Sequence, residues 1–571
     1  MRTAHLNPDS RRAALRNLAR TSAATPLDIL VVGGGITGAG IAFDAATRGL
    51  DVGILEARDW ASGTSSRSSK LVHGGLRYLE MLDFPLVAEA LHERDLLLTR
   101  IAPHLVRPVS FVFPFETLLA DRAYIGSGVT LYDVMAARLG KRRAVPTHRH
   151  LGPGRLAERF PGLAAEYGGI EYFDAQVDDA RLTQLLVRSA VGRGALAANY
   201  ASVVAYLHED DQVVGVRARD EETGEEFAIR AHSTILATSV WTSQQQAAAG
   251  AERGLRVLAS KGIHITVPRE RIAGPPGTGV ITRTDTSVLF IIPWGECWLI
   301  GTTDTPWHED VSHPLVTATD IDRVLSGANA VLADPLTRED VVGAFAGLRP
   351  LLQPVADTGD STRISREHAV KEIAPGLSAI AGGKLTTYRV MAADAVDFAV
   401  RKRFPRSRSR TETEPLLGAE HVALSAPRRE ALTTGYGWDE SRFERLEGRY
   451  GSLLADLLDL IDDRPGLASP LPGAEHCVQA EVVYAARSEG AVHLEDVLHR
   501  RLRLEFEVAD RGVAAARAAA ELAAGELGWD DARITAEVDR FTADVELRRR
   551  AETVATDAEA VALLTTRAGT A

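Results

Sequence analysis

The N-terminal part of the chain alternates short apolar runs with an amphipathic one. Asp28–Val32 is an apolar run that suits a buried parallel strand. The amphipathic run Ala39–Arg48 predicts a helix, and Gly49 can end it as a C-cap. Val52–Leu55 predicts a second strand. The order strand, helix, strand is that of a βαβ unit with a parallel sheet.

Glycines and an acid occupy the key positions of this predicted unit. Gly33, Gly35 and Gly38 have the G-x-G-x-x-G spacing. The first makes a tight turn, the second lets a pyrophosphate approach the backbone, and the third lets helix and strand pack closely. Glu56 ends the second strand, near the spacing expected of a carboxylate that binds a ribose hydroxyl. The pattern predicts a dinucleotide site; the alternative is a glycine-rich structural turn.

The rest of the chain predicts a mixed fold with a helical C-terminal part. Strand-like segments are 108–115, 201–206, 212–218, 226–229, 263–267 and a hairpin over 288–303. Helical patterns cover 86–100, 124–139, 321–332, 386–398, 443–461, 480–489, 494–504 and 512–527. Further on, Ile534, Val538, Phe541 and Val545 form a one-face stripe, which we expect to be packed core. The fold class is therefore α/β with an α+β part.

Composition narrows the class of protein. A chain of 571 residues is expected to form two or three domains, and 45% apolar with 25% charged residues is typical of a soluble globular protein. The net charge of −12 argues against nucleic acid as the main partner. Cys297 and Cys477 lack metal-ligand spacing, so we expect free thiols and no metal site. Neither a membrane-spanning helix nor a secretory signal is predicted.

Three segments look peripheral. Residues 1–25 carry five arginines against one acid, Asp9; we expect a solvated extension, with a basic amphipathic helix on an anionic membrane as the alternative. Arg401–Arg410 (RKRFPRSRSR) is expected to be a solvated linker, although its charge could touch anionic lipid. The tail from about residue 550 to 571 is expected to be frayed.

A hydroxyl-rich segment follows Glu56 directly. Ala61–Lys70 reads ASGTSSRSSK and can bind a polar ligand through side chains and backbone together. LVHGGLRYLE follows, and its Gly74-Gly75 pair permits close approach of a flat ligand. The alternative is an ordinary serine-rich loop.

TSSRSSKLVHGGLRYLE closely resembles the signature of FAD-dependent glycerol-3-phosphate dehydrogenases, relatives of D-amino-acid and glycine oxidases within the glutathione-reductase-like flavoproteins. FDAQVDDARLTQL, LASKGIHITVP, FAGLRPLL and IAGGKLTTY extend the resemblance over residues 27–400, and VYAARSEGAVHLEDVLHRR extends it more loosely. It implies a Rossmann-like FAD-binding domain over 26–405 that is interleaved with an antiparallel-sheet substrate domain (mainly about 81–170 and 250–345). A C-terminal helical domain, 406–571, follows.

The glycine pattern and the resemblance together give a set of expected FAD contacts. These are Gly33, Gly35, Ile36, Thr37, Gly38, Glu56, Ala57, Thr64, Ser65, Ser66, Ser68, Ser69, Lys70, His73, Gly74, Gly75, Val203, Ala237, Gly382, Gly383, Leu385 and Thr386. One segment departs from the family. STILATSVW has Ser239 and Leu236 where family members have glycine and asparagine. If the turn needs a positive φ, serine there costs about 1 kcal/mol or more.

The resemblance also implies the substrate, glycerol 3-phosphate, whose charge requires fixed cations. It maps the family's active-site cations onto Arg77, Arg349, Arg366 and Lys384; for the arginines the alternative is a structural ion pair. His264 is the candidate base for oxidation at C2 to dihydroxyacetone phosphate, with hydride passing to flavin N5. The alternative for His264 is a satisfied strand histidine, and His73 is expected to pack beside the isoalloxazine.

The acceptor of the electrons is left open between membrane quinone and O₂, as in the two branches of the resembled family. The arginine-rich segments favour quinone and a cytoplasmic protein in peripheral contact with the inner face of the cell membrane. Oligomeric state is also left open. Two competing interpretations are a related flavin oxidase of amino or hydroxy acids and a non-catalytic FAD-binding sensor or scaffold.

Overall fold

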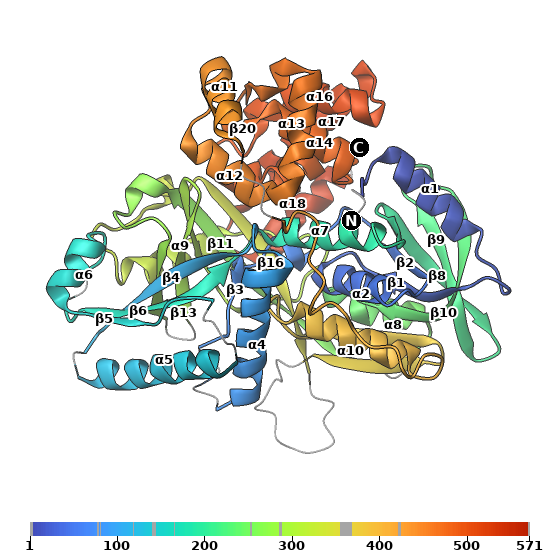
Figure 1. Ribbon diagram of the computed structural model, residues 1–571, viewed down its shortest axis with the longest axis horizontal. Helices are drawn as coiled ribbons and strands as arrows, with labels where there is room; N and C mark the ends of the chain where they lie inside the picture. The colour runs from blue at the N-terminus through green and yellow to red at the C-terminus, as the bar shows by residue number, and fades with distance from the viewer. Residues whose placement is uncertain are drawn as a thin grey trace.

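Two β-sheets lie side by side in the computed structural model, and a helical domain lies across the top of both (Figure 1). The structure describes residues 4–76, 79, 82–117, 119–139, 144–164, 166–251, 254–284, 288–353, 368–420 and 424–568. Element numbers follow Figure 1.

The first sheet has a parallel centre in the order β18-β10-β1-β2-β7, to which β17 and the β8-β9 hairpin add antiparallel. Its strands are β1 (Leu27–Val32), β2 (Val52–Leu55), β7 (Leu196–Ala198), β8 (Ala201–Glu209), β9 (Gln212–Asp220), β10 (Glu226–Leu236), β17 (Ala369–Ala374) and β18 (Leu377–Ala381). Helix α2 (Ile36–Thr47) connects β1 to β2 and packs against α7 (Asp179–Val191) and α10 (Tyr388–Val400). The predicted βαβ unit and the Rossmann-like fold are thus confirmed.

The strand β10 differs from the sequence expectation. The sequence predicted a strand at 226–229 and treated STILATSVW, which starts at Ser233, as a separate segment, whereas one strand runs from the first into the second. Its first half pairs with β9 and its second half with β1 and β18. One continuous strand therefore ties the antiparallel hairpin to the parallel centre.

The second sheet has the order β15-β11-β14-β13-β12-β4-β6-β3, with β16 on the other edge of β11 and β5 beside β6. Its strands are β3 (Leu71–Val72), β4 (Arg107–Pro114), β5 (Arg149–Leu151), β6 (Gly169–Gln176), β11 (Val257–Pro268), β12 (Thr278–Arg283), β13 (Val288–Trp294), β14 (Cys297–Gly301), β15 (Thr305–Pro306) and β16 (Gly343–Leu352). Helices α4 (Phe84–Leu96), α5 (Ala120–Leu139), α6 (Pro153–Arg159), α8 (Thr242–Ala248) and α9 (Ala318–Asn329) connect or flank the two sheets.

The C-terminal domain is helical around a two-stranded sheet. Its elements are α11 (Ala426–Tyr436), α12 (Glu440–Tyr450), α13 (Leu454–Asp463), β19 (Pro470–Leu471), β20 (Ala474–Val478), α14 (Gln479–Ser488), α15 (Leu504–Glu507), α16 (Val513–Leu527), α17 (Asp531–Ala551) and α18 (Asp557–Ala568). The predicted stripe is core, since Ile534, Phe541 and Val545 are buried. The predicted helix 443–461 is instead broken at Gly451, whose φ is +53° and whose added Cβ would lie 1.9 Å from the Gly418 oxygen.

The N-terminal segment is folded, so the expectation of a solvated extension is wrong for its described residues. Helix α1 (Pro8–Ala19) buries Leu15 and Leu18. Arg11 donates to the Asn199 carbonyl at 2.9 Å and to Asp220 at 2.5 Å. Because Arg11 is held by these bonds, it is not available to lipid headgroups.

The tail is folded as well as far as it is described, to Ala568, so the expectation of a frayed end is wrong for these residues. Helix α18 buries Ala560, and Asp557 forms an ion pair with Lys261 of β11. The Lys261 ammonium also lies 2.5 Å from Asp320, and its side chain is buried. A cation on the second sheet therefore anchors the end of the chain.

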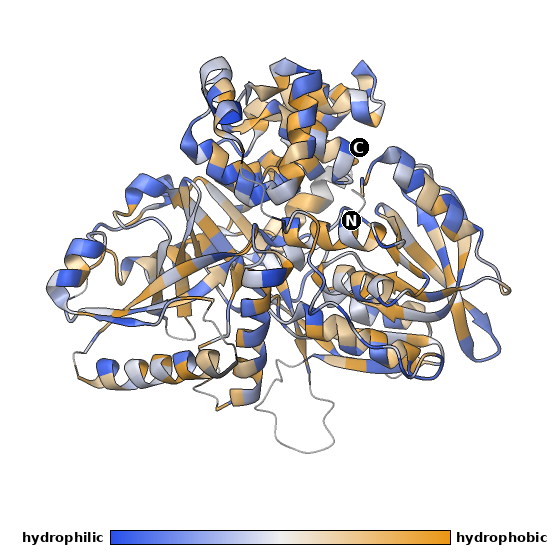
Figure 2. Ribbon diagram, viewed as in Figure 1, coloured by the Kyte–Doolittle hydropathy of each residue, from blue (hydrophilic) through white to orange (hydrophobic). Residues whose placement is uncertain are grey.

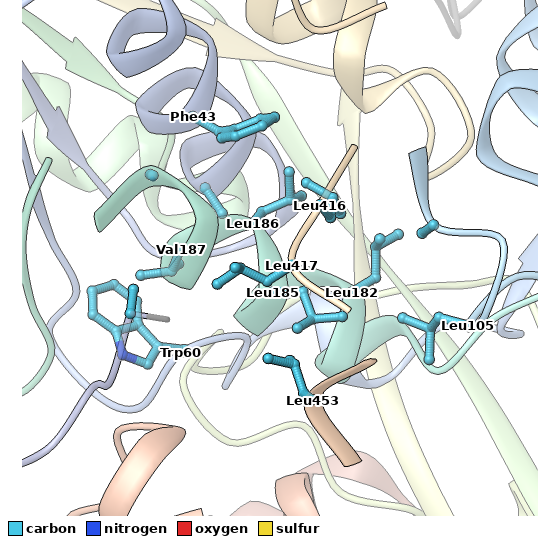
Figure 3. Packing of buried hydrophobic residues seen from close by; sticks show 14 of the residues in the cluster. Phe43, Trp60, Leu105, Leu182, Leu185, Leu186, Val187, Leu416, Leu417 and Leu453 are labelled. Atoms are coloured by element: carbon cyan, nitrogen blue, oxygen red, sulfur yellow. The ribbon is translucent and has the colours of Figure 1, made fainter. Parts of the chain in front are cut away.

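The largest core cluster joins the domains. Figure 3 shows Phe43 of α2 in one cluster with four residues of α7 and three of the C-terminal domain. The α7 residues are Leu182, Leu185, Leu186 and Val187, and those of the C-terminal domain are Leu416, Leu417 and Leu453. Figure 2 shows, for the whole molecule, that apolar residues are concentrated along the central strands and helices. In the described part of the chain no helix combines the length and apolarity needed to cross a bilayer.

Candidate functional site

The glycine turn after β1 has the geometry of a phosphate site. Gly33 adopts φ +111° and donates its N–H to the Leu55 carbonyl at 2.8 Å. A Cβ on Gly38 would lie 1.8 Å from the Gly33 oxygen, so only glycine fits there. Within the described part of the chain, no acceptor receives the N–H groups of Thr37 and Gly38 at the start of α2. These donors fit the pyrophosphate of a dinucleotide.

The N–H of Ile36 next to them donates to Ser65 Oγ at 2.8 Å. A Cβ on Gly35 would approach that same oxygen at 3.0 Å. The hydroxyl-rich segment therefore folds back over the glycine turn, as expected if both segments surround one ligand.

Glu56 lies at the end of β2 beside this turn. Its carboxylate accepts the N–H of Gly34 at 2.7 Å and the N–H of Arg58 at 2.9 Å. Burial raises the pKa of Glu56, and the two backbone donors oppose that rise. The bonds fix the carboxylate in place, and further lone pairs can accept a ribose hydroxyl.

Two other predicted FAD contacts lie next to Glu56. Ala57 follows it directly in the chain. Val203 lies on β8, two residues after Ala201, whose N–H donates to the Glu56 carbonyl at 2.8 Å. Both residues thus surround the end of β2.

The segment that departs from the family, STILATSVW, packs against the glycine turn after β1. Ala237 donates its N–H to Val32 at 2.8 Å, and its carbonyl lies 2.5 Å from the position of a Cβ on Gly33. Ser239 has φ +52°, so this turn does need the left-handed conformation that glycine adopts freely. The parallel pairing of β10 with β1 continues up to Leu236, three residues before this serine.

The hydroxyl-rich segment, called the serine loop (Ala61–Lys70) below, contains a 3₁₀ turn over Thr64–Ser66. Thr64 donates to the Leu348 carbonyl at 2.6 Å, and Ser66 donates to the Gly63 carbonyl at 3.5 Å. Ser68 donates to Asp179 at 2.7 Å. The loop therefore joins the glycine turn to β16 of the second sheet and to α7.

Lys70 was predicted to contact FAD, but the structure places its ammonium in protein contacts. It is fully buried and donates to Asp179 at 3.0 Å and to the Ser66 carbonyl at 3.1 Å. Burial, reinforced by Arg503, lowers the pKa of Lys70 to about 8.

The candidate base, His264 of β11, is 2% exposed. Its Nε2 lies 2.9 Å from Ser69 Oγ, and its ring stacks on Phe345 at 5.0 Å. Its Nδ1 has no hydrogen-bond partner in the described part of the chain. Burial first, and then the charges of Lys70 and Arg349, hold the pKa of His264 well below its ordinary value. A neutral imidazole with one uncommitted nitrogen can accept a proton.

His73 and its neighbours are fixed from α5 and from the segment before α10. His73 donates its N–H to Thr386 Oγ1 at 3.0 Å, and that hydroxyl donates back to the His73 carbonyl at 3.1 Å. Gly74 donates to the Tyr132 hydroxyl at 2.8 Å, and Gly75 adopts φ +75°. The segment that contains Gly74 and Gly75 thus lies against the segment that contains Gly382 and Gly383.

The segment before α10 carries four predicted residues besides Thr386. Gly382 and Gly383 adopt φ +80° and +77°, and Leu385 packs against the main core cluster. The positive charge of Lys384 contributes to lowering the pKa of His73, after burial. The helix begins at Tyr388, two residues later than the predicted start at 386, and Lys384 lies in the preceding loop.

Of the four predicted cations, Arg349 and Lys384 lie in the described part of the chain, and Arg77 and Arg366 lie outside it. Arg349 on β16 donates to Thr302 Oγ1 at 3.0 Å and pairs with Asp304 at 3.3 Å, and its side chain is 33% exposed. It lies near enough to His264 to lower the pKa of that group.

Two residues that organise this region could not be identified from the sequence. Asp179, the first residue of α7, accepts bonds from the serine loop, and Arg503 of the C-terminal domain reaches the same carboxylate at 2.7 Å. Asp179 lies within the quoted VDDARL segment, but nothing in the sequence pairs it with an arginine so distant in the chain.

Comparison with known proteins agrees with this geometry. The chain matches the family described as FAD dependent oxidoreductase over residues 28–389, and the C-terminal domain of alpha-glycerophosphate oxidase over residues 409–534. The fold and site are those of an FAD-dependent oxidoreductase.

The names of similar proteins define the family within this class. "Glycerol-3-phosphate dehydrogenase 2" of Mycobacterium tuberculosis is 48% identical over 95% of this chain and 91% of its own length. The human "Glycerol-3-phosphate dehydrogenase, mitochondrial" is 36% identical over 92% and 73%. The structure of the Bacillus halodurans glycerol-3-phosphate dehydrogenase complexed with FAD superposes with a TM-score of 0.73 at 28% identity, covering 95% of this chain and 98% of that one. The chain therefore belongs to the FAD-dependent glycerol-3-phosphate dehydrogenase family.

Proposed function

We propose that the protein oxidises sn-glycerol 3-phosphate at C2 to dihydroxyacetone phosphate. The observation that carries the proposal is the 48% identity, over 95% of the chain, to relatives with that activity in their names. FAD, when bound, takes up the hydride that leaves C2. The N–H groups of Thr37 and Gly38, for which the described residues offer no acceptor, would hold its pyrophosphate, and Glu56 its ribose.

Binding of the substrate phosphate would fall to cations of the second sheet and of the segment before α10. Arg349 presents a planar fork that suits phosphate oxygens, and Lys384 adds a second positive charge. Arg77 and Arg366 remain predictions from the sequence. Each charge-assisted bond is worth about 1.5–3 kcal/mol, so Arg349→Met should weaken substrate binding by roughly one to two orders of magnitude.

His264 is proposed to accept the hydroxyl proton as the C2–H bond breaks and the carbonyl forms. Its support is the buried Nδ1, which has no hydrogen-bond partner among the described residues, and the low pKa, which keeps the imidazole neutral at pH 7. His264→Asn should keep the yellow flavin spectrum but lose most substrate-driven bleaching. In the native protein, bleaching should persist at pH 6.5 and slow only as the pH falls through the lowered pKa. Unchanged bleaching in the variant would remove His264 from the mechanism.

For the reoxidation step we propose a membrane quinone as acceptor, supported by an exposed apolar surface on α4 and α5. Helix α5 lies at the edge of the molecule beside α4 (Figure 1), buries Ile125, Val129 and Tyr132 on one face, and carries apolar residues on the other. The outward residues of this exposed apolar face are Leu82, Phe84, Leu119, Tyr124, Leu131 and Val134. An exposed apolar surface of this kind is typical of a site that contacts a membrane or another protein.

Vesicle flotation would test this surface. Leu131→Glu should abolish flotation with anionic vesicles, whereas Leu258→Glu, at an equally exposed leucine of β11, should not. Equal flotation of both variants would contradict the assignment. O₂ is the second candidate acceptor, because the C-terminal match bears the name of an oxidase. Faster peroxide release than quinone-analogue reduction would favour it.

A further inference from the structure

The carboxylate of Asp179 binds both ends of a short stretch of the serine loop. It is fully buried at the start of α7. One oxygen accepts the backbone N–H of Ser68 at 3.0 Å and its hydroxyl at 2.7 Å. The other accepts the Lys70 ammonium at 3.0 Å. Ser68 and Lys70 flank Ser69 in the chain. Asp179 thus holds the backbone before Ser69 directly and the residue after it through the Lys70 side chain, and the Lys70 N–H donates to Ser68 Oγ at 3.0 Å.

The C-terminal domain supplies the second cation of this cluster. Arg503 is 1% exposed and donates to Asp179 at 2.7 Å and to the Ser66 carbonyl at 3.2 Å. It follows the π-helical turn Asp496–Arg501 and has φ +68°. Asp178, the neighbouring carboxylate, lies 3.6 Å from Arg503. Two buried cations thus face two buried carboxylates, and removal of one partner would leave an uncompensated charge.

The residue held between these bonds contacts the candidate base. Ser69 Oγ lies 2.9 Å from His264 Nε2, and the opposite nitrogen, Nδ1, is buried without a partner in the described part of the chain. If Nε2–H donates to the serine oxygen, Nδ1 carries the lone pair that a base requires. The charged groups facing the imidazole are Lys70 from the serine loop and Arg349 from β16, and both disfavour the imidazolium.

We propose that Arg503 of the C-terminal domain is a positioning residue for the oxidation: through Asp179 it fixes the serine loop, and Ser69 then holds His264 with Nδ1 free to accept the substrate proton. The inference rests on the proposed function and gives the helical domain a role in it. Arg503 touches neither substrate nor cofactor in this scheme. Its effect is transmitted by the backbone of Ser68–Lys70 and ends at one hydrogen bond.

A double-mutant cycle tests the proposal by stopped-flow reduction of bound FAD with glycerol 3-phosphate under anaerobic conditions. Ser69→Ala should slow the limiting rate by about 10²-fold, the effect of misplacing a catalytic group by about 1 Å. Substrate affinity should stay within about twofold, and Ser69→Thr, which keeps the hydroxyl, should restore most of the rate. Arg503→Lys should slow reduction too, and the double variant should be no slower than Ser69→Ala alone, because both changes break one chain of contacts.

Arg511→Lys is the matched control. Arg511 is also buried, also has positive φ and also belongs to the C-terminal domain, but it pairs with Glu552 at 2.7 Å and not with Asp179. Its rate should stay within about twofold of the native rate. If Arg503→Lys does not fold, Ser68→Ala, which removes a hydroxyl held by Asp179, takes its place in the cycle.

Three results would overturn the inference: a native rate in Ser69→Ala, effects that multiply in the double variant, or loss of FAD from Ser69→Ala, which would assign the hydroxyl to the cofactor. The fraction of FAD retained is therefore measured alongside the rate. A native protein whose flavin is not reduced by glycerol 3-phosphate would instead refute the proposed function itself.

Discussion

Substitution of Gly38 by alanine should weaken the binding of FAD. The added Cβ would lie 1.8 Å from the Gly33 oxygen, whereas an ordinary contact needs 3.4 Å, so the turn and helix must separate by about 1.6 Å. The clash is with backbone, and no rotamer change relieves it. Helix α2 is buried from Gly38 to Thr47, so its displacement disturbs the packing on α7 and α10 as well. Overpacking of this kind costs about 1–3 kcal/mol.

The displacement also moves the N–H groups proposed to hold the pyrophosphate. Each charged hydrogen bond is worth about 1.5–3 kcal/mol, so loss of two bonds should raise the dissociation constant of FAD by at least about 10²-fold. Fluorescence titration of apoprotein with FAD measures this directly. Gly525→Ala is the control: the added Cβ meets nothing within 4 Å in α16, so the free energy of unfolding should rise by about 0.5–1 kcal/mol with FAD affinity unchanged. Native FAD affinity in Gly38→Ala would refute the assignment of this turn.

Three further changes test stability. Ser239→Gly should raise the free energy of unfolding by up to about 1 kcal/mol in urea titrations, because serine there has φ +52°; a lower stability would contradict this. His493 bridges Glu222 and Glu537, and these bonds raise its pKa from 6.5 to about 9 despite burial. Its stabilisation should therefore be complete below pH 6.5 and lost as the pH rises toward 9, and His493→Gln should flatten that part of the pH–stability curve. Glu481, with a pKa lowered from 4.5 to about 2, contributes about 3 kcal/mol that is present above pH 4.5 and lost as the pH falls toward 2; Glu481→Gln should remove it in denaturant titrations at pH 7.

Much of the fold could be predicted from local sequence patterns. The spacing of Gly33, Gly35 and Gly38 predicted the βαβ unit, because at each position a side chain would approach atoms next to the turn too closely. The stripe from Ile534 to Val545 predicted a core helix for the same reason, since helical periodicity is local. The left-handed turn at Ser239 could also be anticipated, because the family pattern has glycine there.

Contacts between distant segments could not be predicted in this way. The arginines of residues 1–25 looked solvated because Asp220, the partner of Arg11, belongs to a hairpin far along the chain. The tail was expected to be frayed because the sequence does not show that Asp557 pairs with Lys261. That ion pair exists only when the second sheet has formed. The cluster at Asp179 was missed for the same reason. Charge pairs of this kind follow from tertiary packing, and residue spacing does not encode them.

The central claim is most directly tested by adding glycerol 3-phosphate anaerobically to the purified protein loaded with FAD and recording the flavin absorption band. We predict that the band bleaches, with one dihydroxyacetone phosphate formed per flavin reduced, and that addition of a quinone analogue restores it. A band that glycerol 3-phosphate leaves unchanged, while an amino acid or another hydroxy acid bleaches it, would contradict the account.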